Sequence, residues 1–280
     1  MLKSETIKKL EKLRKFLGSF KNAVIAFSGG VDSATLTAIC KEEIEEVLAV
    51  TIKTKAIPSR EIENAKKIAI ELGVKHEFLD LDILGIKEFV ENSKDRCYYC
   101  KKYILKSLLS LANNRGFEIV FEGTNSSDLK GDRAGFRAVL EESKVLSPWV
   151  KFEFEKEEIR AIAKSMGFSF HDHPAIACLA TRIPYGFKIT AEALERIDLA
   201  ENNILRLFGV KNVRVRDLKG IAIVEVNQED LWRFLDSRRL LELRKGLHEL
   251  GFHSVLLDLD GYSEGGAKKY SAFSSSDYQH

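Results

Sequence analysis

The six residues Ser28-Gly29-Gly30-Val31-Asp32-Ser33 have the composition of a phosphate-binding loop. Two glycines let the backbone approach a ligand closely, and serine hydroxyls and backbone N–H groups can bind phosphate oxygens. Asp32 can orient Mg²⁺ or cap a helix. The loop lacks the lysine of a Walker A sequence, which disfavours a kinase or motor protein and favours the pyrophosphate portion of ATP as the ligand. A glycine-rich turn without a ligand is the plainer alternative.

Three of the four cysteines have a placement that suits metal binding. Cys97 and Cys100 are separated by two residues, a spacing that lets both sulfurs reach one ion or cluster. Cys178 lies shortly before Arg182, whose positive charge can help to keep a thiolate ionised. A redox pair or buried thiols are the alternatives for Cys97 and Cys100. Cys40 shares an apolar helix face and is expected in the core.

A polar segment, Gly123-Thr124-Asn125-Ser126-Ser127-Asp128, follows an apolar run that is typical of a buried strand. Such a segment lies at the carboxyl edge of a parallel sheet, where open α/β sheets bind ligands. Asp128 and Asp132 are therefore candidate ligands of Mg²⁺, and Arg133 is a candidate substrate contact. A polar surface loop is the alternative. We expect this segment to share its edge of the sheet with the glycine loop, which favours ligand binding.

The elements that must position these residues alternate between strands and helices. Strands are expected at residues 23–27, 46–53, 75–81 and 119–122, and helices at 2–17, 31–45, 59–72, 99–114 and 156–166. Such alternation predicts an α/β fold in which a parallel sheet is covered by helices on both faces. We expect this domain to extend over residues 1–186.

The pattern changes after residue 190. The expected elements are a helix at 191–208, strands at 213–216 and 221–226, a helix at 231–250 and a strand at 254–259. The Leu218-Lys219-Gly220 turn predicts that the first two strands form a hairpin. We expect a smaller α+β domain for substrate binding or oligomerisation over residues 187–268, followed by a disordered tail at 269–280.

The composition excludes several classes of protein. The 280 residues are 45% hydrophobic and carry a formal net charge of +2, which gives no argument for a nucleic-acid or membrane surface and suits a small-molecule substrate. No apolar run reaches the roughly 18 residues of a membrane span, and the charged start lacks the apolar region of a signal peptide. Four cysteines are too few for a disulfide scaffold. We expect a cytoplasmic homo-oligomer.

Several motifs, in this order along the chain, resemble those of the LarE family of PP-loop ATP pyrophosphatases: SGGVDS, CYYCKK, EGTNSSDLKGDRAG, LSPW, ACLATRIPYG, VRVRD and LDLDGY. The resemblance implies a PP-loop (adenine nucleotide alpha hydrolase-like) fold and an ATP-dependent sulfur transferase that forms AMP and pyrophosphate. Its substrate would be pyridinium-3,5-biscarboxylate mononucleotide, a precursor of the nickel-pincer nucleotide cofactor. One carboxylate would be adenylated with ATP and Mg²⁺ and then converted to a thiocarboxylate.

Pattern and resemblance together predict the site residues. The ATP-binding residues are Ala26, Phe27, Ser28, Gly29, Gly30, Val31, Asp32, Ser33, Gly123 and Thr124. The substrate-binding residues are Asn125, Asp128, Asp132, Arg133, Arg182, Glu201, Arg214 and Arg216. Cys178, Asp32 and Arg182 are expected to act in catalysis. The resemblance further implies that Cys97, Cys100 and Cys178 hold a [4Fe–4S] cluster that delivers the sulfur, whereas some family members give up the sulfur of the cysteine that matches Cys178.

The chain departs from the family pattern at Ser127-Asp128, where Asp-Asp is usual, and at Ala134, where proline is usual. Three other functions stay open. A tRNA thiolation enzyme of the PP-loop class is disfavoured by the weak net charge. An amide-forming PP-loop synthetase has no use for three cysteines. A non-catalytic nucleotide-binding or iron–sulfur sensor module would bind ATP without forming AMP. The sequence does not indicate the sulfur donor.

Overall fold

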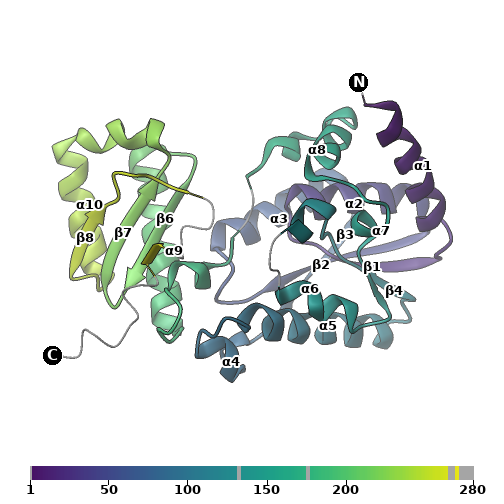
Figure 1. The fold of residues 1–280 in the computed structure, drawn as a ribbon, viewed down its shortest axis with the longest axis horizontal. Coiled ribbons are helices and arrows are strands. Elements are labelled where there is room, and N and C mark those ends of the chain that lie inside the picture. The colour runs from purple at the N-terminus through teal and green to yellow at the C-terminus, as the bar shows by residue number, and fades with distance from the viewer. Residues whose placement is uncertain (1, 131–133, 175–176, 264–268, 271–280) are drawn as a thin grey trace. The chain divides into compact units, whose positions relative to one another are not determined.

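The computed structural model describes residues 2–130, 134–174, 177–263 and 269–270 (Figure 1). The chain forms two compact units. Unit 1 comprises Met1–Thr54, Ser59–Ile83 and Cys97–Ile176, and unit 2 comprises Lys55–Pro58, Leu84–Arg96 and Ala177–His280. In the described part of the chain, no helix is long and apolar enough to cross a membrane.

A five-stranded parallel sheet forms the centre of unit 1. Its strands are β1 (Asn22–Ala26), β2 (Glu46–Lys53), β3 (Lys75–Asp80), β4 (Ile119–Phe121) and β5 (Val145–Leu146). The alternating pattern predicted a parallel sheet and four of these strands, whereas β5 was not expected. The five strands lie in the order β3-β2-β1-β4-β5, which places β1 between β2 and β4. The loops that follow β1 and β4 therefore leave the sheet side by side.

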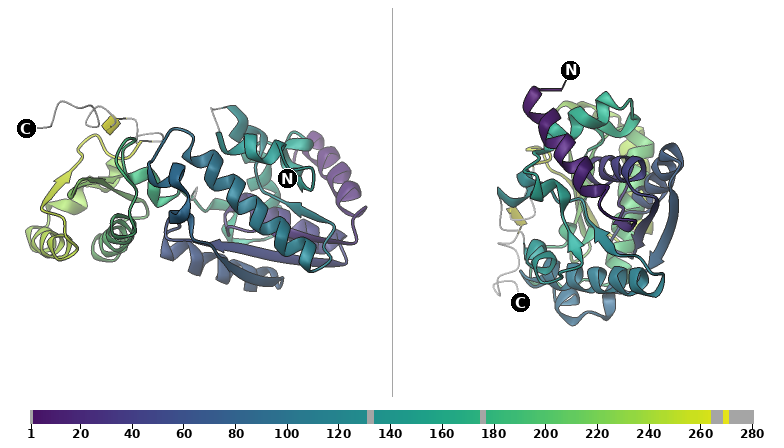
Figure 2. Two further views of the ribbon diagram at one scale, coloured as in Figure 1. Left: turned by 90° about the horizontal axis from the view of Figure 1, so that it is seen from below. Right: turned by 90° about the vertical axis from the view of Figure 1, so that its right-hand side faces the viewer.

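Helices cover both faces of this sheet. They are α1 (Ser4–Leu17), α2 (Val31–Glu43), α3 (Ser59–Leu72), α5 (Arg96–Asn114), α6 (Ala134–Leu140), α7 (Pro148–Lys151) and α8 (Lys156–Ser165). The helix α5 runs along one face, while α1, α2 and α8 lie on the other (Figures 1 and 2). Apolar side chains of β1, α2 and α8 form one core, in which Ile25, Leu36 and Ile162 are fully buried. This core holds the start of α2 in place.

Unit 2 contains a three-stranded sheet in the order β6-β7-β8. Its regular elements are α4 (Lys87–Val90), α9 (Ala191–Phe208), β6 (Val213–Leu218), β7 (Ile221–Val226), α10 (Ser237–Glu249) and β8 (Ser254–Leu257). The predicted hairpin is confirmed, since β6 and β7 are antiparallel. Lys219 and Gly220 both have positive φ, of 50° and 92°, as a tight hairpin turn requires. The third strand, β8, pairs in parallel with β7.

The prediction of a single helix at 231–250 is wrong. A 3-10 helix, η5 (Gln228–Leu235), comes first, and α10 begins only after Asp236. The Asp236 backbone is extended, and its carboxylate accepts the backbone N–H groups of Arg238 at 3.0 Å and Arg239 at 3.3 Å. Because this side chain caps the N-terminus of α10, the helix starts here and cannot continue from the preceding residues. The last strand also ends earlier than expected, at Leu257.

Further 3-10 helices are η1 (Ile83–Gly85), η2 (Ser126–Lys130), η3 (Ser169–Asp172) and η4 (Leu179–Arg182). Residues 177–186 were expected in the first domain, but their contacts assign them to unit 2. Within that unit, the backbone N–H of Leu179 donates to the carbonyl of Ala56 at 2.8 Å, and Arg182 pairs with Glu201 at 2.8 Å. The extents of the two domains as folding units stay predictions.

Candidate active site

The glycine loop connects β1 to α2 in unit 1 and approaches α3 closely. Gly29 has a φ of 75°, and a Cβ atom there would lie 2.7 Å from the Cα atom of Ala65. Only glycine fits this position without strain. Within the loop, the Ser33 hydroxyl lies 3.0 Å from the Ser28 hydroxyl and accepts the Ser28 backbone N–H at 3.1 Å. These bonds fix the loop at the N-terminus of α2, where backbone N–H groups can bind an anion.

The residues that flank this loop differ in what they can offer a ligand. Phe27 and Val31 bury their side chains in the core, so only their backbones can contact a nucleotide. The Phe27 N–H is already bonded to the Val50 carbonyl at 2.9 Å. Ala26 ends β1 and is half-buried. Gly123 lies close to the start of α2, since a Cβ atom added to Gly123 would be 3.0 Å from the Ser33 backbone nitrogen. The chain that leaves β4 therefore packs directly against the start of α2.

Three segments that are distant in sequence converge on Asp32. Its carboxylate accepts a hydrogen bond from Asn125 Nδ2 at 3.3 Å and pairs with the Lys156 ammonium, while its carbonyl accepts the Trp149 indole N–H at 3.0 Å. Burial raises the pKa of Asp32 above the ordinary aspartate value, although the Lys156 ammonium acts in the opposite direction. Asp32 therefore lies at the meeting point of the glycine loop, the β4 loop and α8.

Asn125 connects Asp32 to Asp128. The Asn125 side chain is fully buried, and its Nδ2 atom also lies 3.1 Å from Asp128 Oδ2. In return, the Asp128 N–H donates to Asn125 Oδ1 at 3.1 Å. The predicted proximity of the two loops is thus confirmed, with two carboxylates held by one amide. Asp132 and Arg133 lie outside the described residues, and their roles stay predictions.

Two charged residues of this region did not stand out in the sequence. Lys156 occupies the first turn of α8, where the helix dipole disfavours a cation. That unusual position is a signal that the lysine has an acidic partner, although it does not identify Asp32 as that partner. Glu122 is only 2% exposed although it follows a buried strand directly. A carboxylate so placed requires a positive partner inside the fold.

Glu122 has four donors. Lys101 Nζ lies 2.8 Å away, the Thr124 hydroxyl and backbone N–H donate at 2.7 and 3.1 Å, and the Ser147 hydroxyl also donates. Burial alone would raise the pKa of Glu122, but Lys101 and the hydrogen bonds outweigh it and hold the pKa below the ordinary glutamate value. The predicted ATP-binding residue Thr124 is therefore held by a buried, ionised carboxylate.

A cavity of about 260 Å³ adjoins the glycine loop. It is lined by Gly29, Gly30, Arg60, Glu61, Asn64, His173 and Pro174, all in unit 1. Its size is near the lower end of ordinary small-molecule pockets. The cavity offers a cation and two amide or carboxylate groups beside the loop backbone, which suits part of a nucleotide.

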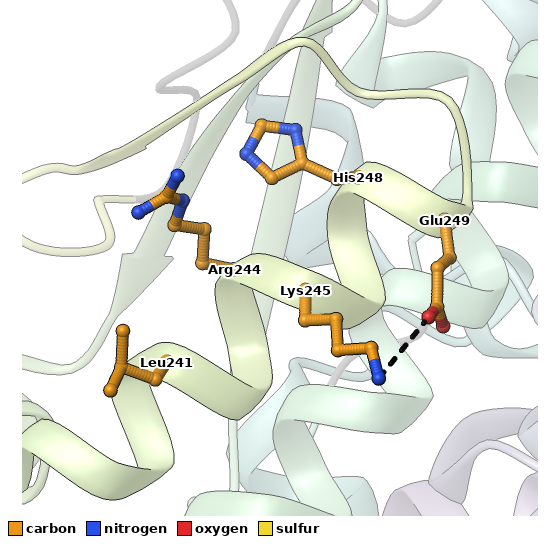
Figure 3. Close-up of a pocket in the computed structure, with 5 residues that line it drawn as sticks. All are labelled: Leu241, Arg244, Lys245, His248 and Glu249. Carbon is orange, nitrogen blue, oxygen red and sulfur yellow. Dashed lines mark ion pairs between the residues drawn. The ribbon is translucent and has the colours of Figure 1, made fainter.

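A larger depression of about 540 Å³ lies in unit 2, on α10 (Figure 3). It is lined by Leu241, Arg244, Lys245, His248 and Glu249. All five belong to one helix, and Lys245 and Glu249 are an exposed pair 3.9 Å apart. The depression is an open helix face, and it contains none of the predicted site residues.

The cysteines have distinct environments. Cys97 is exposed and lies in the first turn of α5, and Cys100 is half-buried and directly follows that turn. Cys178 is half-buried and precedes η4 in unit 2. The core position of Cys40 is confirmed, and burial raises the pKa of its thiol. Among the described residues, no three His, Cys, Asp or Glu side chains gather as a metal site. The three-cysteine set stays a prediction.

In unit 2, Arg182 and Glu201 form a buried pair that supports the turn of Cys178. The guanidinium Nη1 donates to the Cys178 carbonyl at 3.1 Å. Glu201 is fully buried, and besides Arg182 it accepts the Val215 N–H at 3.2 Å. Arg182 thus fixes the backbone at Cys178. Direct contacts of Arg182 and Glu201 with substrate stay predictions.

The predicted phosphate-binding pair, Arg214 and Arg216, is buried within unit 2. Arg216 pairs with Glu225 at 2.7 Å and donates to the Thr181 carbonyl at 2.9 Å. Arg214 donates to Asn212 at 2.7 Å, and its guanidinium lies over the ring of Tyr262. Partners inside unit 2 therefore hold both guanidinium groups, and phosphate binding by these residues stays a prediction.

The sequence is similar to those of several known proteins. A family model described as queuosine biosynthesis protein QueC matches residues 22–94. A pyridinium-3,5-bisthiocarboxylic acid mononucleotide synthase of Lactiplantibacillus plantarum is 30% identical over 251 residues, 89% of this chain and 90% of that protein. An uncharacterized protein of Synechocystis is 35% identical over 258 residues, 92% of this chain and 96% of that protein. A 7-cyano-7-deazaguanine synthase of Bacillus subtilis is 44% identical over 65 residues, 23% of this chain and 30% of that protein.

The parallel sheet and the glycine loop, together with these matches, define an enzyme of the PP-loop ATP pyrophosphatase class that uses ATP. Within that class it is an ATP-dependent sulfur transferase. The chain belongs to the LarE family.

Proposed function

We propose that this enzyme adenylates one carboxylate of pyridinium-3,5-biscarboxylate mononucleotide with ATP and then replaces AMP by sulfur, giving a thiocarboxylate in the route to a nickel-pincer nucleotide. The observation that carries the proposal is the convergence of Asp32, Asn125 and Asp128 at the end of the glycine loop. The similarity over nine-tenths of the L. plantarum synthase supports this choice of substrate.

The first step needs no protein nucleophile. A substrate carboxylate oxygen attacks the α-phosphorus of ATP, the bond to the β-phosphate oxygen breaks, and pyrophosphate leaves as the acyl adenylate forms. The loop N–H groups, the start of α2 and Lys156 stabilise the charge on the leaving phosphates. Asp32 and Asp128 would hold Mg²⁺, an ion that proteins usually bind through one or two carboxylates plus substrate phosphates.

In the second step a sulfur nucleophile attacks the activated carbonyl carbon, and the C–O bond to AMP breaks. Cys97, Cys100 and Cys178 would hold a [4Fe–4S] cluster, whose chemistry is to present a sulfide. Solvent-reachable thiols at Cys97 and Cys100, one helical turn apart, fit such a group. Arg182 orients the backbone of Cys178. Glu201, Arg214 and Arg216 would complete a substrate pocket in the second domain, and we propose a homo-oligomer.

The test is pyrophosphate release by protein purified without oxygen. The pyridinium mononucleotide should stimulate the release and yield AMP and a thiocarboxylate in equal amounts. Stimulation by tRNA instead would assign a tRNA thiolation enzyme, turnover supported by ammonia alone would assign an amide synthetase, and ATP binding without AMP would assign a sensor module.

Iron, acid-labile sulfide and zinc measured per chain test the sulfur step. About four irons, lost in each single Cys97, Cys100 or Cys178 to Ser variant, would support the cluster. An iron-free protein that loses the mass of one sulfur at Cys178 after turnover would instead establish a sacrificial cysteine. A Cys178→Ser protein with an intact cluster and normal turnover would refute both versions.

A further inference from the structure

The ion pair of Lys101 and Glu122 joins the cysteine helix to the nucleotide loop inside unit 1. Lys101 follows Cys100 directly in α5, and its ammonium lies 2.8 Å from Glu122 Oε2. Glu122 in turn directly precedes Gly123 and Thr124. The pair therefore connects two segments that the chemistry of this enzyme uses in different steps.

Both oxygens of Glu122 are shared among the surrounding segments. Oε2 accepts from Lys101 and from the Thr124 hydroxyl, while Oε1 accepts the Thr124 N–H and the Ser147 hydroxyl. Ser147 directly precedes the helix α7, which contains Trp149, and the Trp149 indole N–H donates to the Asp32 carbonyl. One buried carboxylate thus links the turn of the cysteines, the β4 loop and, through Trp149, the glycine loop.

The N-terminal part of α5 is also packed closely against α6. A Cβ atom on Gly135 would lie 3.7 Å from the Cys97 carbonyl and 3.8 Å from Lys101 Cβ. Withdrawal of Lys101 would leave the Glu122 charge buried without a counter-ion, which is strongly unfavourable. The N-terminal part of α5, which contains Lys101, and the loop that contains Thr124 are therefore expected to move as one.

We propose that Lys101 and Glu122 are positioning residues that couple nucleotide binding at Thr124 to the accessibility of Cys97 and Cys100. The inference rests on the use of ATP at the β4 loop but not on which metal or cluster the cysteines hold. Because coupling between two sites is reciprocal, modification of the thiols should in turn weaken nucleotide binding.

The experiment measures alkylation of Cys97 and Cys100 by N-ethylmaleimide, followed by mass spectrometry. It uses protein free of iron and zinc, in the presence of Mg²⁺, with and without a non-hydrolysable ATP analogue. The analogue should slow alkylation about fivefold or more in the wild type, the lower end of usual coupling between sites. In Lys101→Met, with the analogue raised to saturation, the effect should fall below about twofold.

Lys102→Met is the matched control. Lys102 is the next residue of α5, with a side chain that is 33% exposed against 29% for Lys101, and it pairs with Glu141 at 2.6 Å. This variant should keep the full protection. Should Lys101→Met unfold, two further variants test the pair. Glu122→Gln removes the carboxylate charge alone, and Lys101→Met/Glu122→Gln removes both charges together. Each should show the same loss of protection.

Full protection retained in folded Lys101→Met would overturn the proposal, because the nucleotide would then shield the thiols directly. An equal loss of protection in Lys102→Met would also overturn the proposal, because the effect would then not depend on the Lys101–Glu122 pair. If the wild type binds the analogue but its cysteines are alkylated at the same rate, the proposed coupling is wrong, while the proposed function is unaffected. A wild type that fails to bind the analogue would count against the proposed function itself.

Discussion

At the scale of single residues, Asp32 illustrates how neighbours determine what a carboxylate can do. Lys156 and Asn125 hold its two oxygens, and Asp128 lies on the far side of Asn125. In the proposed reaction, a divalent cation that enters with ATP would replace the Lys156 ammonium at Asp32 and release that lysine toward the phosphates. The same carboxylate would then have one partner before and another after nucleotide binding.

Replacing Asp32 with asparagine tests this role. Asp32→Asn keeps the shape and removes the charge, so AMP formation should fall by roughly a hundredfold or more, as for other groups that stabilise transition-state charge. Steady-state AMP release is the measurement, with Mg²⁺ varied. Asp80→Asn, at an exposed position of β3, is the control and should act as wild type. Equal activity of the two variants would remove Asp32 from catalysis.

Glu122 predicts a specific dependence of stability on pH. Its pKa in the folded protein lies below the ordinary value, so its contribution to stability is fully present above the unfolded pKa and is lost as the pH falls through the folded pKa. Urea unfolding between pH 7 and pH 3 should show a smaller acid loss in Glu122→Gln than in wild type. Parallel curves for the two proteins would contradict the assignment.

At the scale of elements, a single cap decides where α10 begins. Asp236→Ala should reduce the free energy of unfolding by about 1 kcal/mol, because the two backbone N–H groups of the first turn lose their acceptor. Asp236→Asn and Asp236→Ser retain a capping oxygen and should lose less. Urea unfolding followed by circular dichroism measures the difference, and an Ala variant as stable as the Asn variant would refute the cap.

The elements that could be predicted have complete local signals. The helix bounds Ser59–Leu72 and Ala191–Phe208 agree with expectation to the residue. For α9, the Thr190 hydroxyl caps the start and Gly209, with a φ of 63°, ends the helix. The expected helix at 231–250 failed because an apolar pattern continues across Asp236 and hides the cap.

The site follows the same division between local and distant information. The glycine loop and the Asn125 segment are local motifs, so the sequence revealed both, and the order of the strands brings them together. Lys156 is 124 residues from its partner Asp32. The sequence around either residue contains no pattern that identifies the other residue as its partner. Pairings of this kind depend on how the helices pack and could not be predicted from one sequence.

At the scale of the whole molecule, unit 2 is built from three separate stretches of the chain. Asn92, from the stretch Leu84–Arg96, is 1% exposed and has a left-handed φ of 56°. Its Nδ2 atom lies 2.8 Å from the Pro184 carbonyl and 2.9 Å from the Phe187 carbonyl. The early stretch is therefore bonded into the later one by a buried side chain.

Asn92→Ala should consequently destabilise unit 2 by about 2–3 kcal/mol, because buried carbonyls lose their donor. Fluorescence of Trp232, in unit 2, can report unfolding of this unit in a Trp149→Phe background. Asn114→Ala, at the end of α5 in unit 1, is the control and should leave that transition unchanged. A transition unaffected by Asn92→Ala would show that the early stretch is dispensable.

The interleaving of the chain has a consequence for biosynthesis. On the ribosome, Asn92 emerges 95 residues before Phe187, to whose carbonyl its side chain donates. At roughly 5–20 residues per second, it waits several seconds for its partner. A gene segment that encodes only residues 177–280 would lack this stretch altogether. We therefore expect a fragment of residues 177–280 to be less stable than unit 2 of the intact chain, because the carbonyls that Asn92 binds would lose their donor.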